Sequence, residues 1–229
     1  SSIASVMLRA PQPDHTFTEA DWSDEELLRN VGQWYPLSKT LAERAAWEFY
    51  ERERQHASWD MVAVNPCMIT GPLLQPTLNT SCEFIVKLMN GKRREVPGGA
   101  MAFVDVRNVA DAHVLAFENP AASGRYICVS WSTTWSEVAS DEPTANSSLL
   151  SLARSHESRL LPRVDSAARY PQYPIPTQVQ QSFLPSEPTK FDLTKLNSLG
   201  VHHITLEQSV VDTVESAIAK GMLQPVAKL

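Results

Sequence analysis

Hydrophobic residues recur at helical spacing from about Pro36 to about Gln55, which predicts a helix there. The repeating positions are Leu37, Leu41, Ala45 and Phe49. Pro36 suits the first turn of a helix, where no amide hydrogen is needed. The apolar segment 60–66 follows and ends in Asn65-Pro66, a composition typical of a buried parallel strand.

Further segments continue an alternation of strands and helices. The apolar residues 126–129 follow Gly124 and predict a second strand, and the small, apolar residues 1–6 predict the end of a buried strand. Helical spacing recurs in four later segments, which are 80–90, 105–118, 192–199 and 205–220. This alternation predicts an α/β fold.

Three segments lack such periodicity. Residues 10–30 are polar and predict a long loop, and the proline-rich residues 170–176 predict a rigid, extended linker. Residues 140–168 are rich in Ser, Ala, Glu and Arg without a repeating apolar face. We therefore expect a disordered or poorly packed stretch there.

The composition narrows the class of protein. A length of 229 residues suffices for one large domain or two small ones, and the net charge of −6 gives no reason to expect nucleic acid or an anionic membrane as partner. No apolar run approaches the ~20 residues needed to span a bilayer. The first residue is not Met and no signal peptide follows, which indicates a processed or truncated product.

The cysteines and histidines give no metal site. Cys67, Cys82 and Cys128 are scattered and odd in number, which argues against a disulfide framework and suits a reducing, cytoplasmic environment. The pair 202–203 has no carboxylate or cysteine at ligand spacing and is expected in a loop.

Tyr35 and Lys39 are the candidate catalytic pair. Four residues apart on a helix, they share one face, so the phenol and the ammonium can meet. A tyrosine titrates near pH ~10 when free, and an adjacent cation stabilises its phenolate, so such a pair can exchange a proton with a carbonyl oxygen. The spacing alone is a weak signal, since a surface tyrosine beside a solvated lysine has the same pattern.

Longer motifs surround this pair. Residues 35–43 read Tyr-Pro-Leu-Ser-Lys-Thr-Leu-Ala-Glu, residues 1–6 read Ser-Ser-Ile-Ala-Ser-Val, and residues 64–81 begin Val-Asn-Pro-Cys-Met-Ile-Thr-Gly-Pro. With residues 103–113 and 124–127, they closely resemble plant cinnamoyl-CoA reductase-like and dihydroflavonol reductase-like proteins. These are extended short-chain dehydrogenase/reductases, and the resemblance covers nearly all the chain except about 140–168.

The resemblance implies roles for individual residues. Tyr35 is the general acid, and Lys39 stabilises its phenolate and bonds the nicotinamide ribose of NADP(H). The serine of the triad falls at Ser2, or at Ser1 if the register differs by one. The further cofactor contacts are Pro66, Cys67, Met68, Ile69 and Ser81, and the candidate substrate contacts are Met7 and Ala102.

The resemblance also implies an architecture. Residues 1–80, to which 104–130 return, form part of a Rossmann-type parallel sheet that is incomplete in this chain. Residues 81–103 and 131–229 form a small substrate-binding domain, with 140–168 as an atypical insertion. We expect a small-molecule carbonyl substrate and a monomer or weak homo-oligomer.

One departure from the family leaves alternatives open. The glycine-rich turn that binds the cofactor pyrophosphate, Gly-x-x-Gly-x-x-Gly or close to it, is formed by none of the eight glycines. The leading hypothesis is an NADPH-dependent reductase of an aldehyde, ketone or acyl-CoA carbonyl in phenylpropanoid or flavonoid-type metabolism. The alternatives are a truncated, inactive paralogue or gene-model fragment, and a nucleotide-sugar epimerase or dehydratase, which shares the Tyr/Lys pair.

Overall fold

The computed structural model describes residues 1–12, 14–56, 58–134, 169–174, 176, 178, 180 and 187–224. The chain divides into two compact units. The first unit comprises Ser1–Ile69, Ala102–Ser132 and Thr189–Ile204, and the second comprises Thr70–Met101, Thr133–Pro188 and Thr205–Leu229. The atypical stretch 140–168 lies outside the described residues.

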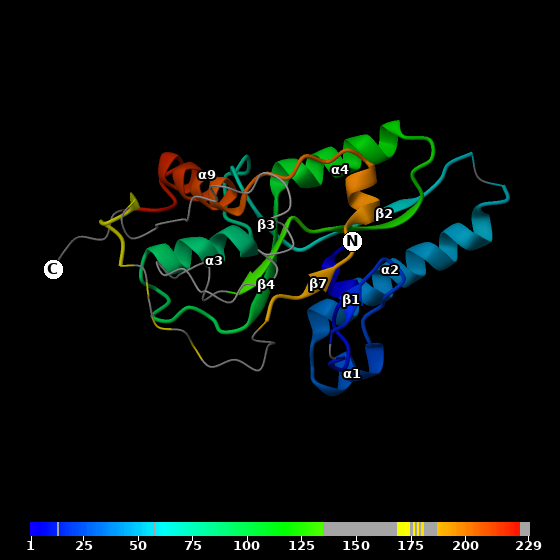
Figure 1. Ribbon diagram of the computed structural model, residues 1–229, viewed down its shortest axis with the longest axis horizontal. Coiled ribbons are helices and arrows are strands. Elements are labelled where there is room, and N and C mark those ends of the chain that lie inside the picture. The colour runs from blue at the N-terminus through cyan, green and yellow to red at the C-terminus, as the bar shows by residue number, and fades with distance from the viewer. Residues whose placement is uncertain are drawn as a thin grey trace. The chain divides into compact units, whose positions relative to one another are not determined.

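Parallel strands and flanking helices form the first unit (Figure 1). Its helices are η1 (Ile3–Ser5), α1 (Glu25–Asn30), α2 (Trp34–Glu53), α4 (Val106–Glu118) and α8 (Thr194–Ser198). Its strands are β1 (Thr16–Phe17), β2 (Val62–Pro66), β5 (Gly124–Cys128) and β7 (Lys190–Phe191). Strands β2 and β5 are parallel, from Val62 opposite Gly124 to Pro66 opposite Cys128, and β1 is parallel to β7. The predicted α/β class is confirmed.

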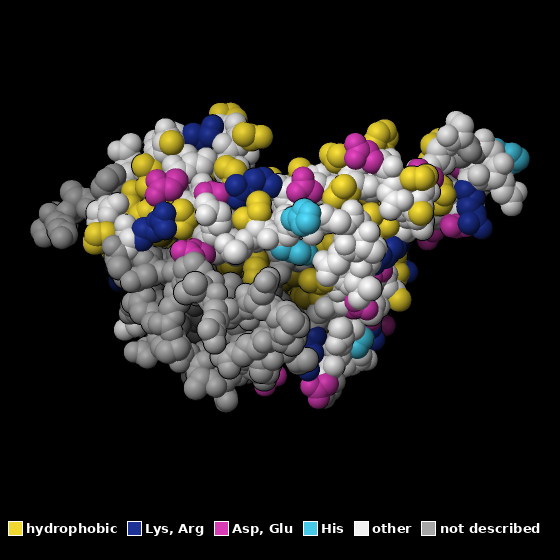
Figure 2. Space-filling model, turned by 45° about the horizontal axis from the view of Figure 1, so that its top comes forward, with side chains coloured by type: hydrophobic (Ala, Val, Ile, Leu, Met, Phe, Trp, Pro, Cys, Tyr) yellow, Lys and Arg dark blue, Asp and Glu magenta, His cyan; other side chains and the backbone are white. Residues whose placement is uncertain are grey.

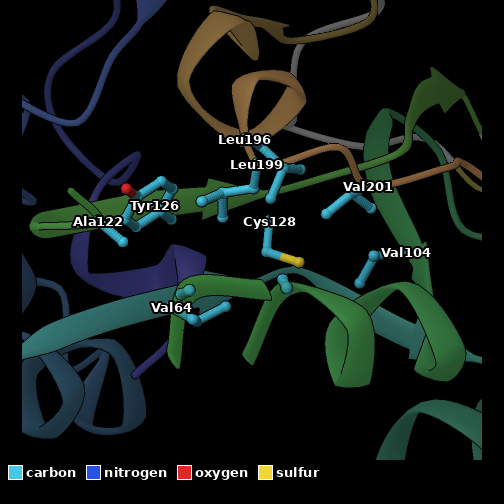
Figure 3. Packing of buried hydrophobic residues seen from close by; sticks show 10 residues of the cluster. Val64, Val104, Ala122, Tyr126, Cys128, Leu196, Leu199 and Val201 are labelled. Atoms are coloured by element: carbon cyan, nitrogen blue, oxygen red, sulfur yellow. The ribbon is translucent and has the colours of Figure 1, made fainter. Parts of the chain in front are cut away.

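The core of the first unit surrounds the β2–β5 pair. Figure 3 shows Tyr126 and Cys128 of β5 lying between Val64 of β2 on one side and, on the other, Leu196 of α8 and Leu199, which follows α8. A second cluster joins Ala102, Ile127 and Val129 to Ile3 and Val6 of the amino-terminal segment. Because these side chains are apolar and almost fully buried, they hold the strand ends and the segment 1–6 in fixed positions.

The second unit rests on two helices, α3 (Thr80–Met89) and α9 (Leu206–Ala219). Their hydroxyls are used locally: Thr70 Oγ1 and Ser209 Oγ are 2.7 Å apart, and the backbone N–H of Leu73 donates to Ser216 Oγ at 2.9 Å. Tyr170 Oη donates to Glu215 at 2.8 Å. A three-stranded sheet has the order β3 (Met68–Thr70), β4 (Ala100–Asp105) and β6 (Trp131–Thr134).

Two of the sequence-based predictions are wrong. Residues 1–6 are no strand: Ser2 caps a 3-10 helix, because its Oγ accepts a hydrogen bond from Ala4 N. The expected loop 10–30 contains strand β1 and helix α1, whose N-cap Asp24 accepts a hydrogen bond from Leu27 N at 2.9 Å. The long helix predicted from about Pro36 is confirmed as α2.

Candidate active site

Helix α2 carries the predicted proton-transfer pair in its first two turns. Pro36 occupies the first turn, where its ring does not remove a helical hydrogen bond. Tyr35 is 62% exposed and Lys39 is half-buried. Lys39 Nζ lies 5.7 Å from the centroid of the Tyr35 ring. The structure therefore brings the two side chains together on one helix face, as their spacing predicts.

The predicted catalytic serine lies in the segment that packs on α2. Ser2 is buried, and its Oγ accepts a hydrogen bond from Ala4 N at 3.2 Å. The alternative residue, Ser1, is exposed, and its Oγ donates to the carboxylate of Glu43. Because helix η1 contacts α2, the serine segment and the helix that carries Tyr35 are direct neighbours.

A buried ion pair joins Glu43 of α2 to Arg125 of β5. Arg125 Nε donates to Glu43 Oε1 at 2.6 Å, and the two side chains are 8% and 2% exposed. Arg125 Nη1 also donates to the backbone oxygen of Glu19 at 2.9 Å, and the guanidinium lies 3.8 Å from the centroid of the Trp22 ring. The arginine is thus held by a carboxylate, a carbonyl and an aromatic face together.

The second oxygen of Glu43 collects three donors. The hydroxyls of Ser1 and Ser5 donate to Oε2, and Asn65 Nδ2 donates to it at 2.7 Å. Asn65 Nδ2 also lies 3.2 Å from the backbone oxygen of Ser2 and 3.0 Å from Ser5 Oγ. One carboxylate therefore connects helix α2, the serine segment and strand β2.

These bonds set the charge of the carboxylate. Burial raises the pKa of Glu43, but the hydrogen bonds from Arg125, Ser1 and Ser5 outweigh that effect, and its pKa lies below the ordinary value. Sequence spacing does not indicate this cluster, because its members come from four separate parts of the chain. The available signal was the position of Glu43, four residues after Lys39 on the same side of the predicted helix.

The predicted nicotinamide contacts lie where strand β2 ends. Pro66 is the last residue of β2, Cys67 N donates to the backbone oxygen of Cys128 at 3.4 Å, and Met68 begins β3. All four residues 66–69 are half-buried. Burial raises the pKa of Cys67 well above its ordinary value and that of Cys128 to about 12, so both are neutral thiols and poor nucleophiles near neutral pH.

The remaining predicted contacts have different surroundings. Met7 packs against the cluster that contains Ile3 and Val6, and Ala102 is a buried member of that cluster. Ser81 belongs to the second unit, where it lies in the first turn of α3. The structure therefore gives Met7 a partly open position, whereas Ala102 is enclosed by the core.

Among the described residues, no group of three or more His, Cys, Asp and Glu is placed to hold a metal ion. His203 hydrogen-bonds Ser130 Oγ through Nδ1 and Asn197 Oδ1 through Nε2, each at 2.9 Å. These bonds attach the loop that contains His203 to two other segments of the first unit. Figure 2 shows acidic, basic and apolar side chains interspersed on the face it presents. In the parts of the chain that the structure describes, no helix is long and apolar enough to cross a membrane.

Comparison with curated proteins identifies plant reductases. The chain is 34% identical over 227 residues to cinnamoyl-CoA reductase 1 of Arabidopsis thaliana, covering 98% of this chain and 58% of that protein. It is 33% identical over 228 residues to tetraketide alpha-pyrone reductase 1 of the same plant, covering 99% of this chain and 61% of the relative. The chain thus spans about three fifths of the length of these relatives. No family model matches it.

Solved structures of reductases are also similar to this chain. Vestitone reductase from alfalfa aligns over 97% of this chain and 64% of its own, with a TM-score of 0.73 and 28% identity. Yeast methylglyoxal/isovaleraldehyde reductase Gre2, solved in complex with NADPH, aligns over 97% of this chain and 64% of its own, with a TM-score of 0.70 and 25% identity.

Proposed function

Because this chain belongs to the extended short-chain dehydrogenase/reductases, we propose that it carries the proton-transfer residues of an NADPH-dependent carbonyl reductase. The substrate is an aldehyde, ketone or acyl-CoA thioester of the phenylpropanoid or flavonoid type. The observation that supports this most is the approach of Lys39 Nζ to the Tyr35 ring, beside the segment that contains Ser2.

In this proposal Tyr35 gives its phenolic proton to the substrate oxygen where an alcohol forms. Its exposure leaves the hydroxyl accessible to a substrate, and the ammonium of Lys39 stabilises the phenolate that remains. Ser2 donates a hydrogen bond to the same substrate oxygen. NADPH, when bound, supplies the hydride to the carbonyl carbon.

The described residues fit one end of that cofactor. In parallel α/β sheets, nucleotides bind beyond the carboxyl ends of the strands. Residues 66–69 lie at the carboxyl end of β2, and Asn65, just before them, hydrogen-bonds the backbone of Ser2. Residues 66–69 and Lys39 would hold the nicotinamide and its ribose. The glycine-rich turn that would hold the pyrophosphate is not formed by the 229 residues.

NADPH oxidation tests the proposal. The chain is assayed alone and fused at its amino terminus to the glycine-rich nucleotide-binding segment of a family member. Cinnamoyl-CoA, cinnamaldehydes and dihydroflavonols serve as substrates. We expect the fusion to reduce at least one of them and Tyr35→Phe to lower kcat by about 100-fold or more.

Tyr50→Phe is the matched control, because Tyr50 lies on the same helix but contacts Trp47 and Trp59. A fusion that folds yet reduces none of these carbonyls would overturn the proposal. An equal effect of the two phenylalanine variants would remove Tyr35 from the proton transfer.

A further inference from the structure

We propose that Glu43 is a positioning residue: its carboxylate holds the serine segment, residues 1–5, against the helix that presents Tyr35 and Lys39. The inference rests on the proposed function, since the positioned groups are those assigned to proton transfer. Glu43 itself is buried, and the hydroxyls of Ser1 and Ser5 donate to its carboxylate.

Glu43 lies in a row with the proposed catalytic pair on helix α2. Tyr35, Lys39 and Glu43 follow one another at intervals of four residues on one side of α2. Exposure decreases along this row, from an exposed tyrosine through a half-buried lysine to a glutamate with a side chain only 2% exposed. The inner end of the row is therefore fixed in the protein, while its outer end is open.

The two oxygens of the carboxylate have different partners. Oε1 accepts from Arg125, which is itself held by the backbone of Glu19 and by the face of Trp22. Because Arg125 is held in this way, the carboxylate keeps one orientation. Oε2 then faces the serine segment, where Ser1 and Ser5 donate to it. A fixed acceptor at this place determines where the serine segment lies against α2.

Asn65 extends the same network to the strand end. Its Nδ2 donates to Glu43 Oε2 and to the backbone oxygen of Ser2, and the next residue is Pro66. Ser5 Oγ is a third acceptor near Nδ2, and the three acceptors together fix the orientation of the amide. A single carboxylate thus ties together the three segments that the proposed reaction needs.

An ion pair that served stability alone would not have to hold the serine segment in one place. In such a pair the hydrogen bonds to Oε2 would only help to compensate the buried charge, and they would not determine where the serine segment lies. The positioning role predicts instead that losing the Oε2 contacts displaces the serine segment even while the ion pair survives. Ser5→Ala separates the two roles. It removes the Ser5 donor to Oε2, together with the contacts of that hydroxyl with the backbone oxygen of Ser2 and with Arg125 Nη2, and it leaves the bond from Arg125 Nε to Glu43 Oε1 in place.

Amide hydrogen exchange on the 229-residue chain tests the link directly. The variants are Glu43→Gln, which turns a carboxylate oxygen into a donor, and Ser5→Ala. Their controls are Glu48→Gln, an exposed site on the same helix, and Ser198→Ala, an exposed site elsewhere in the first unit. We expect faster exchange at residues 5–7, whose amides bond within η1, while α2 stays protected.

Steady-state kinetics of the fusion described above tests the consequence. We expect Glu43→Gln to lower kcat by about 100-fold and Ser5→Ala by on the order of 10-fold, with KM for NADPH unchanged and the controls at wild-type rates. Unchanged exchange at residues 5–7 in both variants would overturn the inference. Faster exchange with an unaltered kcat would equally overturn it.

If Glu43→Gln does not fold, Ser5→Ala decides by the same two measurements. A wild-type fusion without turnover would count against the proposed function, not against this link. The exchange measurement would then decide whether Glu43 holds the serine segment.

Discussion

Arg125 Nε donates to Glu43 Oε1 across 2.6 Å, although 82 positions separate the two residues in the sequence. The contact joins the middle of helix α2 to strand β5 inside the first unit. A charged pair with so little exposure contributes to stability only as a complete unit, because each charge alone would be buried without compensation.

Removing the arginine therefore has a predictable cost. We expect Arg125→Met to reduce the free energy of unfolding by about 3–5 kcal/mol, since it leaves the Glu43 carboxylate buried without its counter-charge. Urea unfolding followed by circular dichroism gives the value. Arg52→Met is the control, because the Arg52 side chain is 69% exposed beside Glu53, and such surface pairs contribute about 0–1 kcal/mol. Equal losses in the two variants would contradict the assignment.

The same carboxylate predicts how stability depends on pH. The pKa of Glu43 is lowered from its ordinary value in the folded protein, so its contribution to stability is complete above that ordinary value and is lost as the pH falls through the folded pKa. The free energy of unfolding should then fall more steeply below about pH 4 in the wild type than in Glu43→Gln.

Denaturant midpoints measured across the acid range check this. Glu48→Gln should keep the wild-type slope. Asp21 should leave a residual slope in every variant, because burial raises its pKa but the hydrogen bonds from Thr18 and the contact with His15 lower it overall. If the free energy of unfolding fell equally steeply with acid in the wild type and in Glu43→Gln, the pKa of Glu43 would not be lowered in the folded protein.

The cysteines should be inert in the folded chain. Cys82 and Cys128 are 2% and 0% exposed, and burial raises the pKa of their thiols to about 11 and about 12. Since the thiolate is the reactive form, we expect no maleimide adduct on either residue at pH 7 within a time that labels the urea-unfolded chain completely. Mass spectrometry of peptides from the two samples reports it. Native labelling at the unfolded rate would contradict the packing of β5 and α3.

Local pattern was enough for the long elements of this fold. The apolar spacing predicted helix α2, although of its repeated positions Leu37 is buried while Leu41 and Phe49 are exposed. Helix α9 has a Thr205 cap whose Oγ1 accepts from Gln208 N at 3.2 Å. The two- and three-residue strands β1 and β3 have no periodicity of their own, because they exist only through partners elsewhere in the chain. Residues 1–6 are apolar enough for a strand, yet the hydroxyl of Ser2 caps a helical turn.

One part of the candidate site could be predicted from the sequence, and the other part could not. Tyr35 and Lys39 lie about one helical turn apart, so their spacing predicts that the two side chains approach one another, and they do so in the structure. Arg125 and Asn65 gave no such signal, because an arginine or an asparagine in a strand is ordinarily a surface residue. Their convergence on Glu43 depends on the folded chain, and sequence spacing does not contain it.

The final prediction concerns the cofactor. Helix α2 and residues 66–69 would provide contacts to the nicotinamide end, but the sequence forms no glycine-rich turn for the pyrophosphate. Backbone amides at such a turn bind the most highly charged part of the molecule, so we expect the 229-residue chain to bind NADPH weakly or not at all. Isothermal titration of the chain and of the fusion with the glycine-rich segment compares the two directly, and the fusion should bind far more tightly. A dissociation constant in the micromolar range for the chain alone would overturn this prediction and would mean that residues outside the usual turn hold the phosphates.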